Sequence, residues 1–167
     1  IGASHGHSWP GICAALLFAA WQLALSQRRI RDLRLIAAAL ALGTLLDGGA
    51  AASGLIHYAA NSLALPPGGA PLWILALWGA FGLTLRSLNW LAGRPWLGML
   101  LGAVGAPLSY GSASRGWHVL TFAPPWWHGV LWLAVGWALA MALLIGLIAR
   151  GSPARNAGAW ISRGKAR

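Results

Sequence analysis

The sequence predicts an all-α fold, a polytopic bundle of transmembrane helices, because it is poor in charge and divided into long apolar runs. Of its 167 residues, 8% are charged and 58% are hydrophobic, whereas a soluble domain carries about 25% charged residues. Several runs approach the ~20 apolar residues that a helix needs to cross hydrocarbon. We therefore expect residues 1–150 to form a single transmembrane helical domain, followed by a basic cytoplasmic tail over 151–167.

Five spans are expected from the apolar runs and from the signals that separate them. The first begins at Pro10 and precedes the basic stretch SQRRIRDLR, which is the order of a stop-transfer helix and the reverse of a signal peptide. Pro66 and Pro67 break the chain before the third span, and the stretch AGRP turns it into the fourth. The spans are expected at about 10–27, 35–58, 71–91, 96–110 and 126–149.

The fourth span is the least regular of the five. Gly98, Gly102 and Gly105 recur on one of its faces, and small residues let another helix approach closely. We expect that face to pack on the second span. Residues 111–125 are expected to form either an interfacial hairpin or a re-entrant segment buried in protein.

The basic residues indicate the orientation of the bundle. Cytoplasmic loops of membrane proteins are enriched in Lys and Arg, and all but one of the 12 Lys and Arg residues fall on one side of this topology. The exception is Arg115. The C-terminus is therefore expected in the cytoplasm. Five spans and a first residue that is Ile1 rather than Met predict a sixth span ahead of it in the full-length protein.

The net charge of +10 does not indicate a nucleic-acid-binding protein. The basic residues lie in short clusters beside apolar runs, and no nucleic-acid-binding motif is present. Membrane lipids are the expected partners, because anionic head groups attract such clusters. Asp32, one turn after Arg28, is expected to form a solvated surface pair with it. Cys13 is the only cysteine, so an internal disulfide is excluded.

Asp47 is the strongest candidate for a functional, catalytic residue, because it lies in the middle of the second span. A carboxylate within hydrocarbon is costly and is functional by default. It could carry a proton, act as a general base, or bind a cation or a lipid head group. The structural alternative is a carboxyl group that joins helices through hydrogen bonds to Thr44, Ser109 or Tyr110.

Histidines on the outer side are candidates for a metal site. His57, His118 and His128 all fall there in the expected topology, and imidazole is the commonest metal ligand in proteins. The alternative is that they are ordinary histidines of outer loops and helix ends. No HxxxH or HxxEH spacing is present, and the sequence specifies no cofactor.

Tryptophans gather at the same outer side. Trp117, Trp126 and Trp127 could contact a lipid chain, although belts of tryptophan also anchor helices at membrane interfaces. Ser109 and Tyr110, near the outer end of the fourth span, are further candidates for contact with a lipid or substrate.

Four stretches carry a resemblance to a known family: GASHGHSWPG (2–11), LGTLLDG (42–48), APLWILALWGAFGLTL (70–85) and GRPWLGMLLGAVGAPLSY (93–110). They resemble small bacterial inner-membrane proteins catalogued only as a domain of unknown function. The resemblance spans nearly the whole chain and implies no catalytic role for any residue. Genes of the family often lie beside those of cyclopropane-fatty-acid-synthase-like proteins, which implies a part in membrane-lipid modification.

Three functions fit these observations. The first is a non-catalytic accessory protein that serves a lipid-modifying enzyme, its partner, at the bacterial inner (plasma) membrane. The second is a membrane-embedded enzyme that acts on acyl chains or head groups through Asp47 and the outer histidines. The third is a small proton-coupled transporter or flippase with Asp47 as its proton site, which at this size would need to form a homodimer.

Overall fold

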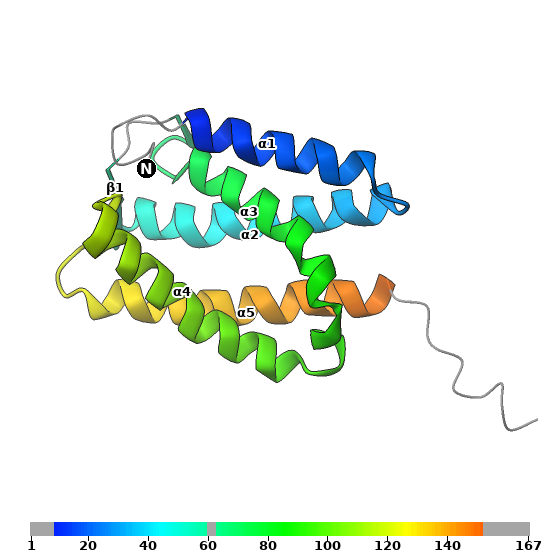
Figure 1. Ribbon diagram of the computed structural model, residues 1–167. Coiled ribbons are helices and arrows are strands. Elements are labelled where there is room, and N and C mark those ends of the chain that lie inside the picture. The colour runs from blue at the N-terminus through cyan, green and yellow to red at the C-terminus, as the bar shows by residue number, and fades with distance from the viewer. Residues whose placement is uncertain (1–8, 60–62, 152–167) are drawn as a thin grey trace, which may run out of the picture.

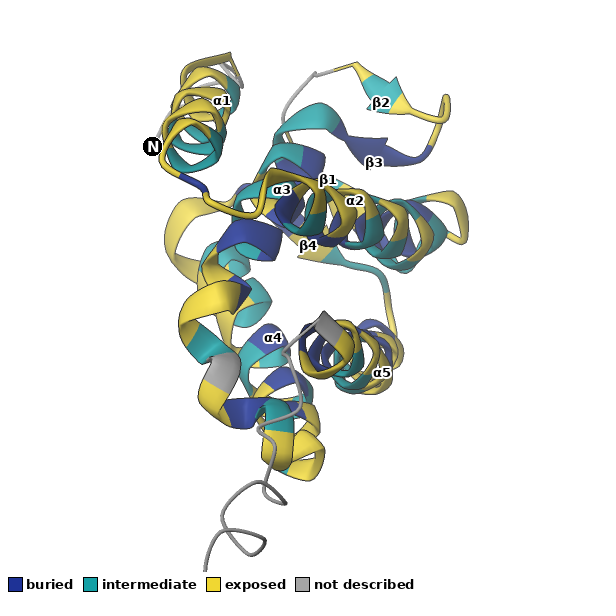
Figure 2. Ribbon diagram, turned by 90° about the vertical axis from the view of Figure 1, so that its right-hand side faces the viewer, coloured by how far each residue is buried: buried dark blue, intermediate teal, exposed yellow. Residues whose placement is uncertain are grey.

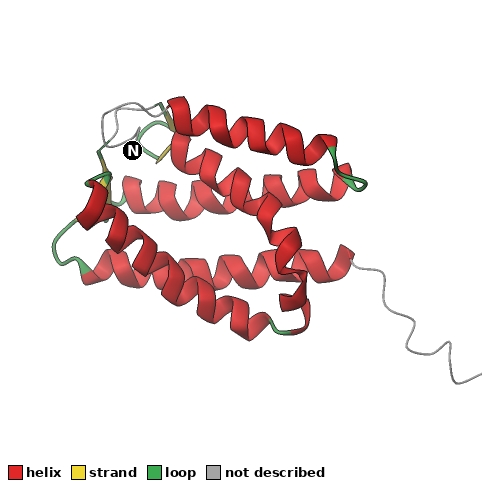
Figure 3. Cartoon of the chain, viewed as in Figure 1, coloured by secondary structure: helices red, strands yellow, loops and turns green. Residues whose placement is uncertain are grey.

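The computed structural model describes residues 9–59 and 63–151, and these form an all-α protein (Figure 1). Its strands are short and lie at the helix ends (Figure 3). Strand β1 (Ile56–Tyr58) pairs antiparallel with β4 (Leu120–Phe122), and β2 (Ala64–Leu65) pairs with β3 (Ala70–Pro71). The helices are α1 (Trp9–Ala24), α2 (Arg29–Ala52), α3 (Leu72–Thr84), α4 (Pro95–Trp117) and α5 (Trp127–Gly151), and the 3-10 segment η2 (Leu85–Gly93) continues α3.

Successive helices run in opposite directions, so the bundle has two ends (Figure 1). One end carries the N-terminus of α1 and strands β1 and β4, and the other carries the α1–α2 connection and the end of α5. Helix α3 packs on α1 and α2, while α5 packs on α2, η2 and α4. The prediction of an all-α fold is confirmed.

Two helices are long and apolar enough to cross a membrane by length and composition, over Arg29–Ala52 and Trp127–Arg150. Two further apolar helices, Trp9–Ala24 and Leu72–Leu88, are shorter. The structure therefore supports two of the five expected spans on this criterion. The expected cytoplasmic tail over 151–167 begins at the last residue of α5 and otherwise lies outside the described residues.

Helix α2 begins at Arg29 and ends at Ala52, whereas a span was expected at 35–58. The basic cluster belongs to the helix. Asp32 lies in the first turn of α2, where a carboxylate stabilises the helix through its interaction with the helix dipole. The helix ends early because Gly54 takes a φ of +71°, a conformation that favours glycine. The chain then pairs with β4 instead of continuing the helix.

Helix α4 continues to Trp117, beyond the end expected near Tyr110. The small residues after Tyr110 are helical, and Ser112 Oγ donates a hydrogen bond to the Leu108 carbonyl one turn earlier. The helix ends at His118, whose φ is +49°. Residues 111–125 therefore do not form a hairpin of their own, since they complete α4 and then supply β4, which pairs with β1. A re-entrant segment stays a prediction.

The core lies between α2, α3, η2 and α5, and the outward helical faces are exposed (Figure 2). Its fully buried side chains include Leu85, Leu91, Leu144 and Ile148. A second, smaller core joins Ala50 and Leu133 to the paired strands. The outward faces carry many large apolar side chains, among them Leu17, Leu45, Leu108 and Leu139. Apolar surface this extensive indicates burial against something other than water.

Gly98 and Gly102 of the small-residue face of α4 pack on α5, not on α2. A Cβ atom added at Gly102 would lie 2.5 Å from the carbonyl oxygen of Trp137, and one added at Gly98 would lie 2.0 Å from Ile145 Cδ1. Close approach of two helices through small residues was predicted correctly in kind. The prediction that the second span is the partner is wrong, because the backbone nearest Gly102 is that of α5.

We expect Gly102→Val to destabilise the protein by about 1–3 kcal/mol, because the added atoms would meet backbone that cannot move aside. Gly146→Val is the matched control, since a Cβ atom at that position in α5 meets nothing within 4 Å. Thermal unfolding in detergent micelles measures both. Equal losses of stability in the two variants would contradict the close α4–α5 packing.

Candidate functional site

Asp47 is fully buried, at 0% exposed, and accepts three hydrogen bonds. Tyr58 Oη and Tyr110 Oη each donate to Oδ1 at 2.6 Å, and Trp78 Nε1 donates to Oδ2 at 2.6 Å. The donors come from β1, α4 and α3, while Asp47 comes from α2. We call these four residues the Asp47 cluster. One carboxyl group thus joins α2 to β1, which follows it closely in the sequence, and to α3 and α4, which lie further along the chain.

Strand pairing and a close helix contact position two of the three donors. Pairing of β1 with β4 sets Tyr58 opposite Leu120 and so holds the tyrosine beyond the end of α2. Trp78 lies against Gly43, one turn before Asp47, where an added Cβ atom would be 2.4 Å from the indole ring. Glycine at that position therefore lets the indole reach the carboxyl group.

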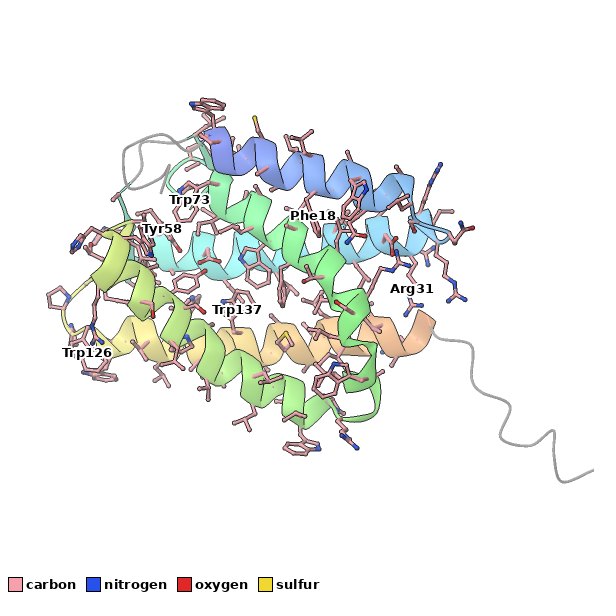
Figure 4. The ribbon with its side chains drawn as sticks, viewed as in Figure 1. Phe18, Arg31, Tyr58, Trp73, Trp126 and Trp137 are labelled. Atoms are coloured by element: carbon pink, nitrogen blue, oxygen red, sulfur yellow. The ribbon has the colours of Figure 1, made fainter. Side chains whose placement is uncertain are left out.

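Aromatic contacts hold the cluster from the other side. Trp78 stacks on Trp137 of α5 with ring centroids 4.2 Å apart and planes at 23°. Phe81 meets Trp137 edge-on at 5.3 Å, and Tyr58 meets Trp73 edge-on at 6.0 Å. Such pairs add about 0.5–1.5 kcal/mol each beyond their buried area. Figure 4 shows Tyr58 beside Trp73, and Trp137 directed from α5 into the bundle.

An apolar cavity of about 520 Å³ lies beside the Asp47 cluster, between α3, α4 and α5. Trp78 and Tyr110 of the cluster line it, but Asp47 does not. Leu77 and Leu101 also line it, and both are about half exposed, at 55% and 49%. The cavity therefore opens on the surface of the bundle. Its other walls include Trp73, Ile74, Phe81, Leu88, Gly105, Ala106, Ser109, Trp137 and Met141.

The three predicted metal-binding histidines are all exposed. His57 lies in β1, His118 follows α4, and His128 lies in the first turn of α5 with its ring 3.9 Å from that of Trp127. Within residues 9–59 and 63–151, no three His, Cys, Asp or Glu side chains gather as a group able to hold a metal ion. A metal site at these histidines stays a prediction that the geometry does not favour.

The residues predicted to contact lipid fall on different surfaces. Ser109 and Tyr110 line the apolar cavity. Trp126 lines a separate hollow of about 870 Å³ near the end of α4. Trp117 and Trp127 line neither of these, and both are exposed. The structure therefore places only Ser109 and Tyr110 at the cavity beside Asp47.

Two members of the Asp47 cluster were not predicted from the sequence. Tyr110 was one of three expected partners, whereas Thr44 donates to the Leu40 carbonyl instead. Tyr58 and Trp78 were missed. The sequence did contain a signal for Tyr58, because the chain has only two tyrosines, and the structure shows that Tyr58 and Tyr110 both donate to Asp47. Trp78 lies inside an apolar run, away from the interfaces where tryptophan is usually placed.

The fold and the site together define a class: an all-α protein with two helices able to cross a membrane, built around a buried carboxyl group beside an apolar cavity. A family model described as "Protein of unknown function (DUF2878)" matches residues 1–143, and the chain belongs to this family. That result confirms the resemblance to a family catalogued as a domain of unknown function. Comparisons with curated proteins and with solved structures found no match.

Proposed function

We propose that this protein is a multi-pass protein of the bacterial inner membrane, with its C-terminus in the cytoplasm, that holds a lipid chain in the apolar cavity. In this proposal it acts as an accessory component of membrane-lipid modification, with a lipid-modifying enzyme as its partner. The observation that carries the proposal is the cavity itself, about 520 Å³ in volume and walled largely by apolar side chains.

Charge and exposure support the membrane location. Only 8% of the residues are charged, and large apolar side chains cover the outward faces of the helices. Among the described residues, the arginines other than Arg115 gather toward the end of the bundle formed by the α1–α2 connection, the η2–α4 connection and the end of α5 (Figure 1). That asymmetry is what the positive-inside rule produces.

The size and opening of the cavity support a lipid chain as its occupant. Pockets of about 300–1,000 Å³ hold small ligands, and an apolar wall selects an apolar one. Leu77 and Leu101 at the opening belong to the exposed apolar surface, which in a membrane faces acyl chains. The indole Nε1 of Trp73, in the cavity wall, is buried without a hydrogen-bond partner among the described residues. This N–H group therefore lacks the acceptor that buried polar groups almost always have, and an ester carbonyl of the lipid would supply one.

The same geometry favours a structural role for Asp47. Both carboxyl oxygens accept hydrogen bonds, and Asp47 itself does not line the cavity. His57, His118 and His128 do not line it either. Catalysis by Asp47 with the histidines, and proton-coupled transport by a homodimer, stay predictions without a geometric observation in their favour.

Filling the cavity tests the proposal. A Cβ atom at Gly105 meets nothing within 4 Å, and Gly105 lines the cavity, so Gly105→Trp should occupy it without disturbing its neighbours. Displacing about 100 Å² of apolar contact costs ~2.5 kcal/mol, so we expect the affinity for lipid to fall by more than about tenfold. Photo-crosslinking to a lipid that carries a diazirine on its acyl chain measures this.

Gly146→Trp is the matched control for that experiment. Gly146 is also a helical glycine with nothing within 4 Å of an added Cβ atom, but it does not line the cavity. We expect wild-type crosslinking in this variant. Unchanged crosslinking in Gly105→Trp would show that the lipid chain binds elsewhere and would refute the proposed function.

A further inference from the structure

A small polar pocket of about 200 Å³ lies at the arginine-rich end of the bundle. It is formed where the start of α2, η2 and the end of α5 meet, and Figure 4 shows Arg31 at this end. We call it the arginine pocket. None of its residues lines the apolar cavity. They are Arg28, Arg31, Asp32, Leu35, Arg86 and Ile148.

Asp32 is the buried acidic group of the arginine pocket, at 0% exposed. Its Oδ2 accepts hydrogen bonds from Ser26 Oγ and from Arg86 Nη1, the latter at 2.8 Å. The expectation of a solvated pair with Arg28 is therefore wrong, because the folded chain brings Arg86 from η2 to the carboxylate. Asp32 Oδ1 is buried and has no hydrogen-bond partner among the described residues.

Arg31 presents the complementary group. Its Nη2 donates to the Ile148 carbonyl at 2.6 Å, which holds the guanidinium against the end of α5. Its Nε is buried and, within the part of the chain that the structure describes, has no acceptor. Buried polar groups are almost always hydrogen-bonded. The arginine pocket thus contains one buried donor and one buried acceptor without partners among the described residues, and its three arginines and one aspartate give it an excess of positive charge.

We propose that the arginine pocket binds the head group of a phospholipid whose phosphodiester is followed by a hydrogen-bond donor, as in phosphatidylethanolamine or phosphatidylglycerol. The phosphate accepts from Arg31 Nε and lies among the guanidinium groups, which suit phosphate oxygens. The ammonium or hydroxyl group of the head group donates to Asp32 Oδ1. This site rests on the membrane location proposed above but not on the apolar cavity. Basic pockets between helices on the cytoplasmic side are where lipid head groups bind.

Head-group selectivity of the wild-type protein tests the site without any substitution. Native mass spectrometry of the full chain in detergent would compare short-chain phosphatidylethanolamine, phosphatidylglycerol and phosphatidylcholine. Phosphatidylcholine has the phosphate but no N–H or O–H group for Asp32 Oδ1. We expect it to bind about tenfold more weakly, since hydrogen bonds to charged groups are strong. Equal binding of the three lipids would overturn the proposal. Competition by inorganic phosphate at the same concentration as lipid would also overturn it, in favour of free phosphate as the ligand.

Two arginines of α2 provide a matched pair of variants. Arg31→Gln and Arg34→Gln each remove one charge from the start of the helix, but Arg34 is exposed and does not line the pocket. We expect phosphatidylethanolamine to bind about tenfold more weakly to Arg31→Gln and within about twofold of wild type to Arg34→Gln. Equal weakening would mean general attraction to basic surface, and the proposed site would be wrong.

The two proposals fail in distinguishable ways. Gly105→Trp should abolish acyl-chain crosslinking in the cavity and leave head-group selectivity intact, because the two sets of lining residues do not overlap. Arg31→Gln should weaken head-group binding and leave acyl-chain crosslinking in the cavity intact. If Arg31→Gln does not fold, the selectivity of the wild-type protein decides the question alone.

Discussion

Asp47→Ala is expected to destabilise the folded protein by about 3 kcal/mol or more. The substitution removes the acceptor for Tyr58, Trp78 and Tyr110 at once, and each buried donor left unpaired costs about 1–3 kcal/mol. It also leaves a void where the carboxyl group was. Unfolding by heat in detergent micelles, followed by circular dichroism, measures the loss.

Asp47→Asn separates the structural role from a chemical one. The amide keeps an acceptor oxygen, and its NH₂ group can donate to a tyrosine hydroxyl, which is itself an acceptor. We expect a loss of about 1 kcal/mol and wild-type crosslinking of lipid in the cavity. A stable Asp47→Asn protein that has lost crosslinking or transport would contradict the structural role and restore the carboxylate as a functional group.

Trp78→Ala is expected to cost about 3–5 kcal/mol, the range for removing a buried tryptophan. The indole is 2% exposed. It stacks on Trp137, lies against Gly43 and donates to Asp47. Its removal therefore opens the core and leaves Asp47 Oδ2 without its donor. The midpoint of thermal unfolding gives the size of the effect.

Trp78→Phe is the control that isolates the hydrogen bond. Phenylalanine retains a ring to stack on Trp137 but has no N–H for Asp47, so we expect the smaller loss of about 1–3 kcal/mol. A double-mutant cycle with Asp47→Ala then gives the coupling energy between the two side chains. Additive losses would show that the 2.6 Å contact between Trp78 Nε1 and Asp47 Oδ2 contributes no stability of its own.

The sequence was sufficient to predict five helices and to show that the Asp47 carboxyl group, inside one of them, needs hydrogen-bond partners. Apolar runs predict helices directly, and a carboxylate inside such a run must find partners wherever they lie. The partners themselves depend on distant parts of the chain. Tyr58 reaches Asp47 only because β1 pairs with β4, more than 60 residues later, and no local pattern encodes that pairing.

The small residues of α4 also show that a local pattern does not identify a distant partner. The glycines of α4 predict that some helix approaches closely, but their spacing does not say which one, and α5 takes the place expected for α2. Asp32 and Arg86 are a second case. Arg28, one turn earlier, was expected to pair with Asp32, whereas the folded chain supplies Arg86, 54 residues away. Contacts of this kind follow from the packing of whole helices.

The separation of Asp47 from its donors has a consequence for biosynthesis. When α2 leaves the ribosome, Tyr58 follows within 11 residues, but Trp78 and Tyr110 are 31 and 63 residues further along the chain. In a membrane, the nascent helix would therefore wait with an incompletely paired carboxyl group, which hydrocarbon disfavours. We expect α2 to remain at the insertion machinery until α4 has been made. Helix α2 would then leave the insertion machinery only after α4 has supplied the last hydrogen-bond donor to Asp47.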